Sequence, residues 1–286
     1  MELADLAPFG EGRRRSDGAG APEDGPPPSA TGYDSVTETP GLPASPEQLS
    51  MLYTRYHLAA ELGRGRDVLE VACGSGIGLA YVARNARSAV GGDVDPVLLA
   101  IARANTAGLA DVRPMDAHAL PFGDQSLDLV LLLEAIYYLA DAQTFVAEAC
   151  RVLRPGGHLY ICSTNCEREP FNPSPRSTRY YTAAELWSLL RERHLDVTLF
   201  AAFPHRVEGV RGRLVSMAWR LAVRWRLVPK TMRGKSVLKR LLHRNARPMP
   251  STLTDGLAPL EPMVQIEPDR PVRDFKVLYA VGQKPL

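Results

Sequence analysis

The sequence predicts an α/β fold built around one mostly parallel sheet, and two patterns support this prediction. From residue 67 onward, short apolar segments alternate with segments of helical length that show helical spacing of apolar residues. This alternation is typical of successive strand–helix–strand units. The first apolar segment ends in a glycine-rich turn, VACGSGIG at residues 71–78, which suits a sharp junction between a strand and a helix.

The first expected helix covers residues 46–62, because Ser45 is a favourable N-cap and Pro46 suits the first helical turn. Strands and helices then alternate, and Asp141 is expected to cap the third helix of this series. The expected strands are 67–72, 88–93, 111–115, 126–133 and 158–163, and the helices between them are 78–85, 96–107 and 141–153.

After residue 163 the alternation changes. A helix is expected at 182–193, where Thr182 as N-cap and Glu185 three residues later form a capping box. A strand follows at 196–203, and the last strand begins at Asp274. These two late strands could pair antiparallel, with the residues between them as a long insertion.

The composition divides the chain into three parts. Residues 1–45 are rich in Pro, Gly, Ser and acids, so we expect a disordered tail without catalytic residues. Residues 46–165 form the expected cofactor-binding core. Residues 166–286 continue the same domain, with an insertion at about 204–272 on the substrate side and the last strand at 274–283.

The overall composition is that of a globular protein. Of 286 residues, 45% are hydrophobic and 23% are charged. No apolar segment approaches the length of a membrane span, and no secretory signal is visible at the start, so a cytoplasmic location is expected. Cys73, Cys150, Cys162 and Cys166 fit no paired zinc spacing, so we expect reduced thiols and no metal site.

Basic residues are concentrated in one segment. Residues 206–247 contain thirteen Lys or Arg and one acid, which gives +12 in a chain of net charge +2. The pattern is that of an amphipathic basic helix, and three interpretations stay open. The segment could cover the acceptor site, dock on an anionic membrane at its inner face, or bind an anionic substrate or nucleic acid. The acidic remainder of the chain argues against nucleic acid.

Two acids near the glycine-rich turn bear on the ligand that it holds. Glu70 lies just upstream of the turn, and Asp93 ends the next strand, nineteen residues after Gly74. A dinucleotide would bring a pyrophosphate to the turn, where Glu70 would repel it, whereas an ammonium or sulfonium group would be attracted. Asp93 could accept hydrogen bonds from both hydroxyls of a ribose. No GxxxxGKS or GxxxxGKT sequence occurs, which excludes a P-loop.

Five segments together resemble the motifs of class I S-adenosylmethionine-dependent methyltransferases, in that family's order and spacing. They are VLEVACGSGIGLA (68–80), VGGDVDP (90–96), MDAHALPFGDQSLDLV (115–130), LEAIYYL (133–139) and LRPGGHLYI (153–161). The resemblance implies a Rossmann-like, seven-stranded, mostly parallel sheet with an antiparallel last strand, to which the basic segment adds a helical insertion. It also implies S-adenosyl-L-methionine as cofactor.

The resemblance assigns roles around this cofactor. Asp93 would bind the ribose, Val94 would face the adenine, and Asp116 would bind the adenine amino group. Tyr53 and Arg55 on the first helix could meet the cofactor carboxylate or lie on a surface helix. The full set implied at the cofactor is Tyr53, Arg55, Glu70, Ala72, Gly74, Gly76, Asp93, Val94, Asp116, Ala117, His118 and Glu134.

Catalysis would rest on holding the acceptor in line with an already activated methyl group. A hydroxyl acceptor usually needs a general base, whereas a carboxylate acceptor needs none. His205 follows the strand at 196–203, near where acceptors bind in this fold, and is one candidate base. Glu134 and Tyr137 follow the fourth strand beside the expected methyl. Glu134 could instead only position the cofactor, and Tyr137 could only form part of the pocket wall.

The sequence therefore predicts an S-adenosylmethionine-dependent methyltransferase that acts at oxygen on a small or lipid- or sugar-linked acceptor. The basic segment loosely resembles segments in methyltransferases of bacterial cell-surface or secondary-metabolite pathways, so a bacterial biosynthetic role is expected. An RNA or other N-methyltransferase and a cofactor-binding scaffold without catalysis are the alternatives. No NPPY-like sequence follows the fourth strand, which argues against branches that methylate adenine or glutamine amino groups.

Overall fold

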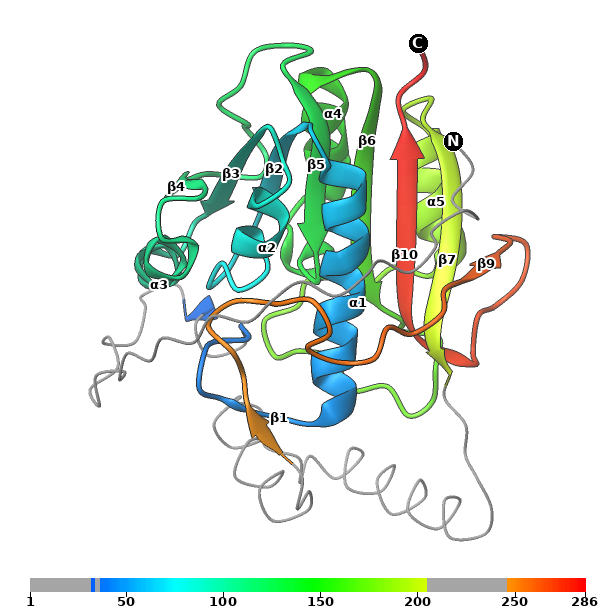
Figure 1. The fold of residues 1–286 in the computed structure, drawn as a ribbon. Coiled ribbons are helices and arrows are strands. Elements are labelled where there is room, and N and C mark those ends of the chain that lie inside the picture. The colour runs from blue at the N-terminus through cyan, green and yellow to red at the C-terminus, as the bar shows by residue number, and fades with distance from the viewer. Residues whose placement is uncertain (1–31, 34–36, 205–245) are drawn as a thin grey trace, which may run out of the picture.

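The computed structural model describes residues 32–33, 37–204 and 246–286, whose main sheet is mixed and has helices on both faces (Figure 1). The strands of this sheet are β2 (Asp67–Val71), β3 (Ser88–Asp93), β4 (Asp111–Pro114), β5 (Leu127–Leu133), β6 (Leu153–Thr164), β7 (Asp196–Pro204), β9 (Val264–Ile266) and β10 (Phe275–Gln283). The helices are α1 (Pro46–Gly63), α2 (Leu79–Ala83), α3 (Pro96–Thr106), α4 (Ala142–Val152) and α5 (Ala183–Arg191), with a short 3-10 helix η2 (Ile136–Tyr138).

The sheet order is β4-β3-β2-β5-β6-β10-β7-β9. The five strands from β2 to β6 pair parallel, whereas β10 is antiparallel to both of its neighbours, β6 and β7. The predicted α/β class and the antiparallel last strand are therefore confirmed. The sheet has eight strands instead of seven, because the short β9 pairs antiparallel with β7 at the edge.

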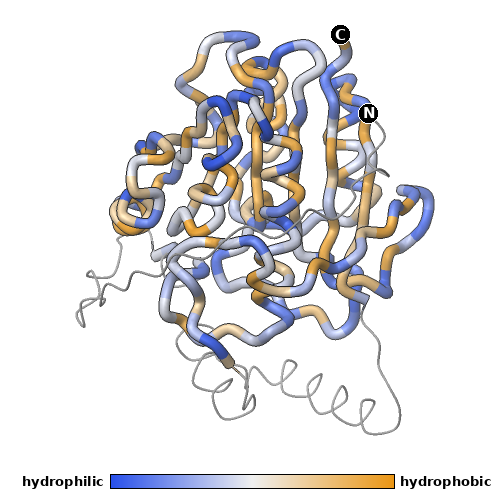
Figure 2. Tube along the Cα trace, in the orientation of Figure 1, coloured by the Kyte–Doolittle hydropathy of each residue, from blue (hydrophilic) through white to orange (hydrophobic). Residues whose placement is uncertain are grey.

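The core lies on both faces of the central strands. Val130 and Leu132 of β5 belong to the cluster that includes α4 and α5, whereas Leu129 and Leu131 belong to the cluster on α1 and α2. Because helices cover both faces, the central strands are apolar along their length (Figure 2). None of the helices in the described part of the chain is both long and apolar enough to cross a membrane.

Helix starts follow the predicted caps. Ser45 Oγ accepts the Gln48 N–H at 3.2 Å, and Gln48 Oε1 accepts the Ser45 N–H at 3.0 Å, so α1 begins with a capping box. Asp141 caps α4 through the N–H groups of the next turn. Thr182 and Glu185 form the predicted capping box of α5.

Two elements differ in length from the prediction. β6 begins at Leu153 and not at residue 158, because Leu153 already pairs with Leu127 before an irregularity in the ladder. Gly156 has φ +76°, so Pro155, Gly156 and Gly157 form a distortion within the strand and not a turn before it. The helix expected at 78–85 is shorter, since α2 covers Leu79–Ala83.

The chain also contacts the core earlier than its composition predicts. The tail was expected to be disordered to residue 45, but β1 (Pro43–Ala44) pairs with β8 (Arg247–Pro248). Ser75 Oγ donates to the backbone oxygen of Glu38 at 2.6 Å. Hydrogen bonds to the backbone hold these residues in place. Composition did not predict this, because it indicates only how much apolar surface a segment can bury.

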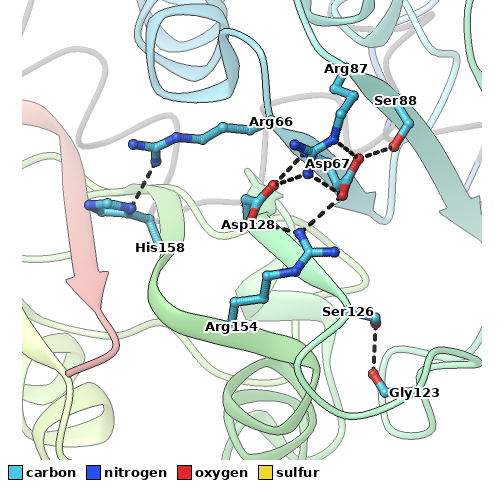
Figure 3. Close-up of polar contacts among 9 residues, drawn as sticks. All are labelled: Arg66, Asp67, Arg87, Ser88, Gly123, Ser126, Asp128, Arg154 and His158. Carbon is cyan, nitrogen blue, oxygen red and sulfur yellow. Dashed lines mark hydrogen bonds and ion pairs between the residues drawn. The ribbon is translucent and has the colours of Figure 1, made fainter. Parts of the chain in front are cut away.

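A charge network ties together the amino ends of the parallel strands, at the edge opposite the glycine-rich turn (Figure 3). Arg87 contacts Asp67 and also Asp128, the latter at 2.7 Å. Arg154 contacts Asp67 at 3.0 Å and Asp128 at 2.7 Å. The hydrogen bonds from Arg87, Ser88 and Arg154 hold the pKa of Asp67 well below its ordinary range, the largest effect coming from Arg87.

We expect Asp67→Asn to lower the free energy of unfolding by about 1–2 kcal/mol at pH 7, because two arginines lose a charged acceptor. The pKa of Asp67 is lower in the folded than in the unfolded state, so its stabilisation is complete above about pH 5 and declines as the pH falls through about 4. Urea unfolding at pH 7 and pH 3 should therefore show a smaller difference between variant and wild type at pH 3.

The control is Asp269→Asn, since Asp269 is exposed and its ion pair, among the described residues, is with its neighbour Arg270. It should change stability by less than about 0.5 kcal/mol. A difference for Asp67→Asn that stays constant from pH 7 to pH 3 would contradict the ionic origin of the stabilisation.

Candidate functional site

A cavity of about 490 Å³ lies at the carboxyl ends of the parallel strands. Its wall includes the turn after β2, the ends of β3 and β5, and one face of α1, which crosses in front of the sheet in Figure 1. This edge is where open parallel sheets bind ligands, and the volume is in the range of small-molecule sites.

The cavity brings together most of the residues predicted from the sequence. Those that line it are Arg55, Ala72, Gly74, Asp93, Val94, Asp116, Ala117, His118, Glu134 and Tyr137. Tyr53, Glu70 and Gly76 do not line it. His205 and the basic segment up to residue 245 lie outside the described residues.

One helical face of α1 forms a wall of the cavity. Its lining residues, spaced three or four apart, are Gln48, Met51, Leu52, Arg55 and Tyr56. Tyr53 lies off this face, and its hydroxyl accepts the N–H of Gly256 at 3.0 Å. Contrary to the prediction, Tyr53 therefore holds the segment around Gly256 against α1 and does not reach the cofactor wall.

Asp93 connects the floor of the cavity to the glycine-rich turn. Its carboxylate accepts the N–H of Gly74 on one oxygen and the N–H of Asp95 on the other, both at 2.9 Å. These bonds fix the carboxylate and leave further lone pairs on both oxygens for a ligand. Burial raises the pKa of Asp93. The arrangement could accept hydrogen bonds from two neighbouring ribose hydroxyls.

Gly76 serves packing and not ligand contact. A Cβ on Gly76 would lie 2.9 Å from the Cα of Ala102 in α3, and its φ is +69°. Only glycine allows this approach in this conformation. Gly76 therefore holds the glycine-rich turn against α3 and does not line the cavity.

An apolar side chain and a carboxylate lie beside Asp93 on the cavity wall. Val94 is 52% exposed, which is unusual for a valine and suits contact with a flat ring. His118 Nε2 accepts the N–H of Asp141 at 3.2 Å, so its Nδ1 carries the proton and donates to Asp116 at 2.7 Å. His118 thereby orients Asp116, whose carboxylate could accept an adenine amino group.

Glu70 lies behind the cavity wall, contrary to the prediction that it contacts the ligand. Its Oε1 accepts the hydroxyl of Tyr56 at 2.6 Å, and Tyr56 itself lines the cavity. The Oε2 atom is buried without a hydrogen-bond partner. Burial raises the pKa of Glu70 to about 8, so the carboxyl group is mostly protonated at neutral pH.

Glu134 occupies the end of β5 with φ +55°. Its Oε2 accepts the hydroxyls of Tyr137 and Thr164, each at 2.8 Å. In the described part of the chain, its Oε1 has one donor, the thiol of Cys162 at 3.6 Å, which is a weak one. Burial raises the pKa of Tyr137, which keeps the hydroxyl a donor. The carboxylate is thus fixed in place and keeps one oxygen available to the cavity.

Arg55 is buried and pairs with Glu38. The Arg55 Nε has no hydrogen-bond partner, and both residues line the cavity. The backbone oxygen of Glu38 is bonded to Ser75 in the glycine-rich turn. The Glu38 carboxylate therefore already pairs with Arg55, which is the residue expected to bind the carboxylate of the cofactor.

Several lining residues were not predicted, among them Tyr33, Glu38, Tyr56, Thr164, Arg168 and Lys276. Tyr56 follows Leu52 by one helical turn, so helical spacing on the first helix could have indicated it. Glu38 and Tyr33 lie in the segment expected to be disordered, where no sequence pattern placed them at a site.

Together, the parallel sheet, the glycine-rich turn and the Asp93 carboxylate define an α/β protein suited to a nucleoside-containing cofactor. A family model described as a methyltransferase domain matches residues 69–161. A probable S-adenosylmethionine-dependent methyltransferase of Mycolicibacterium smegmatis is 35% identical over 176 residues, which is 59% of this chain and 67% of the relative. The chain belongs to the class I S-adenosylmethionine-dependent methyltransferases, and S-adenosylmethionine is its methyl donor.

Two other relatives are named for their acceptors. A demethylmenaquinone methyltransferase of Tropheryma whipplei is 32% identical over 44% of this chain. A phthiotriol/phenolphthiotriol dimycocerosates methyltransferase of Mycobacterium tuberculosis is 42% identical over 38% of this chain. The chain spans 53% and 41% of the length of these two relatives, respectively.

Solved structures confirm the fold. A methyltransferase from Thermotoga maritima aligns with a TM-score of 0.55 at 15% identity, over 82% of this chain and 89% of that chain.

The residues around the cavity fit this cofactor. The fixed Asp93 carboxylate suits its ribose, the exposed Val94 suits its adenine, and the glycine-rich turn admits close approach to backbone. When bound, the cofactor supplies a methyl group on a positively charged sulfur.

We expect Asp93→Asn to weaken binding of S-adenosylmethionine and S-adenosylhomocysteine at least tenfold, because the amide replaces one acceptor by a donor. Hydrogen bonds to a charged group contribute about 1.5–3 kcal/mol, which is roughly a factor of 10 to 100. Isothermal titration calorimetry measures the change, with Asp111→Asn, at the exposed start of β4, as the control. Unchanged affinity in a folded Asp93→Asn protein, or tight binding of NADH, would contradict this role.

Glu38→Gln should strengthen binding of S-adenosylhomocysteine about fivefold, because it removes a carboxylate that competes for Arg55. 5′-Methylthioadenosine lacks the cofactor's carboxylate, so its affinity should not change. Calorimetry with both ligands shows whether the change in affinity depends on the carboxylate of the cofactor. Weaker binding of S-adenosylhomocysteine would instead mean that Glu38 itself binds the cofactor.

Proposed function

We propose that the protein transfers the methyl group of S-adenosylmethionine to an oxygen atom of a small or lipid-linked acceptor. The observation that carries the proposal is the position of Glu134 at the end of β5, with two hydroxyl donors on Oε2 and the other oxygen facing no strong donor. A fixed carboxylate in the cavity suits the removal of a proton from a hydroxyl.

Glu134 would act as the general base. The acceptor oxygen would form the new bond to the methyl carbon while the bond from that carbon to sulfur breaks. Its electron pair would stay on the sulfur of the departing S-adenosylhomocysteine, and the hydroxyl proton would pass to Glu134. The hydroxyls of Tyr137 and Thr164 hold the carboxylate in place meanwhile. Holding both partners in line supplies much of the rate.

The wall near Glu134 favours an acceptor with an apolar body. It includes Leu133, Leu139, Tyr138 and Val277. Tyr137 stacks on Tyr180 at 4.5 Å between ring centroids, which stiffens this side of the cavity. The mycobacterial relative is named for a lipid acceptor, which supports a lipid-linked acceptor for this chain as well.

Methylation of a ring carbon is the second candidate, because the Tropheryma whipplei relative is named for demethylmenaquinone. An experiment with labelled cofactor distinguishes methylation at oxygen from methylation of a ring carbon. The protein is incubated with S-adenosylmethionine that carries a ¹³C-methyl group, first with lipid extracts and then with aqueous cell extracts. The ¹³C chemical shift of the product separates a methoxy group from a methyl on carbon. Label only in RNA would overturn both.

Glu134→Gln should lower kcat about 100-fold on the extract fraction that accepts the methyl group, because the amide cannot take the proton. Its affinity for S-adenosylhomocysteine should stay within about threefold. Tyr137→Phe is the matched control, since it keeps the ring and removes one hydrogen bond, and should lower kcat only about fivefold. A variant that keeps kcat but loses cofactor affinity would show that Glu134 only positions the cofactor.

A further inference from the structure

Among the residues that the structure describes, Arg168 is the cation of the cavity wall that forms no ion pair. It lies in the loop after β6 and is half-buried. Within residues 32–33, 37–204 and 246–286, its buried Nε atom has no hydrogen-bond partner, and its NH1 group donates to the backbone oxygen of Pro170 at 3.3 Å. Among the residues that the structure describes, no carboxylate lies within 4.0 Å of its guanidinium. Burial accordingly lowers the pKa of Arg168.

Lys276 adds a second cation to the same part of the wall. It lies at the start of β10, where its backbone oxygen accepts the N–H of Asn165 at 2.9 Å, so it is beside the loop that carries Arg168. Its ammonium group pairs with Glu47, which is 52% exposed. Arg168 is attracted by Glu47 and Glu134 only at longer range. Glu47 therefore acts on both cations, but it is open to solvent and pairs directly with Lys276 and not with Arg168.

Lys276 has an ion pair with Glu47, whereas Arg168 has only the longer-range attraction of Glu47 and Glu134 in the part of the chain that the structure describes. A partly desolvated guanidinium without a partner is costly unless a ligand neutralises it. Its planar donors match a carboxylate or a phosphate in two parallel hydrogen bonds. Glu134, at the methyl-transfer end of the cavity, is close enough to Arg168 for its charge to raise the pKa of the guanidinium.

We propose that Arg168, supported by Lys276, binds an anionic group of the acceptor, a carboxylate or a phosphate, while the reacting atom of the acceptor faces Glu134. This inference rests on the proposed function and narrows its substrate class to anionic acceptors with an apolar body. The cofactor's own carboxylate has a separate candidate partner in Arg55, which is joined to the glycine-rich turn through Glu38.

The first experiment uses the full chain saturated with S-adenosylhomocysteine and titrates benzoate and benzamide, which differ in charge but hardly in shape. Wild type should bind benzoate at least tenfold more tightly than benzamide. Arg168→Gln should bring the two affinities to within about twofold, and Arg168→Lys should keep part of the preference. Arg179→Gln is the control, since Arg179 is an exposed cation paired with Glu185 outside this cavity, and it should behave as wild type.

Equal affinities for benzoate and benzamide in the wild type, or a benzoate preference that survives Arg168→Gln, would overturn the proposal. Titration of Arg168→Gln with S-adenosylhomocysteine shows whether the variant is folded. It also shows whether the anion that Arg168 binds belongs to the cofactor or to the acceptor. If Arg168→Gln weakens S-adenosylhomocysteine tenfold but leaves 5′-methylthioadenosine unchanged, Arg168 holds the cofactor carboxylate, and the acceptor assignment is wrong.

The methylated product tests the same inference independently. Labelled product from the extract assay should be retained on an anion exchanger and released by salt. In that assay Arg168→Gln should raise KM at least tenfold with kcat within about threefold. A neutral labelled product would refute the anionic subsite and leave methylation standing. Failure to label any fraction would instead refute the proposed function, and the benzoate titration would still decide on the subsite.

Discussion

The two hydrogen bonds accepted by Asp93 are the constraint on which the cavity depends. They join the backbone of Gly74, just past β2, to that of Asp95, just past β3. Neither N–H can be satisfied by strand pairing, because both strands have ended. One carboxylate therefore fixes two loops relative to each other before a ligand binds. Such preorganisation reduces the ordering cost of binding.

The side chains around this fixed floor form two layers. Tyr56 lines the cavity and donates to Glu70 behind it, and His118 orients Asp116 while accepting from the start of α4. The Tyr56 hydroxyl is thus held by the buried Glu70 of β2, and the Asp116 carboxylate is held by the half-buried His118. This explains why Glu70 and Gly76 belong to the motif although they do not line the cavity. Glu70 holds the hydroxyl of Tyr56, and Gly76 lets the glycine-rich turn pack against α3.

Much of the fold was predictable because strand and helix signals are local. Caps such as Ser45 and Asp141 and the apolar strands mark their elements without reference to the rest of the chain. The residues that were missed act across long distances in sequence. Glu38 pairs with a helix residue and Lys276 pairs with Glu47. Tyr53 was misplaced because its direction depends on which face of α1 meets the sheet, which spacing alone does not fix.

The two arginines of the cavity wall, the buried Arg55 and the half-buried Arg168, show how the charge of the site is divided. Arg55 is neutralised by Glu38, a residue of the same chain, whereas Arg168 has no such partner among the described residues. Because Glu38 already pairs with Arg55, binding of a ligand carboxylate there would exchange one carboxylate for another. Binding at Arg168 would instead relieve an uncompensated charge. Selection among ligands by charge should therefore be stronger at Arg168 than at Arg55, because a neutral ligand there leaves the desolvated cation unpaired.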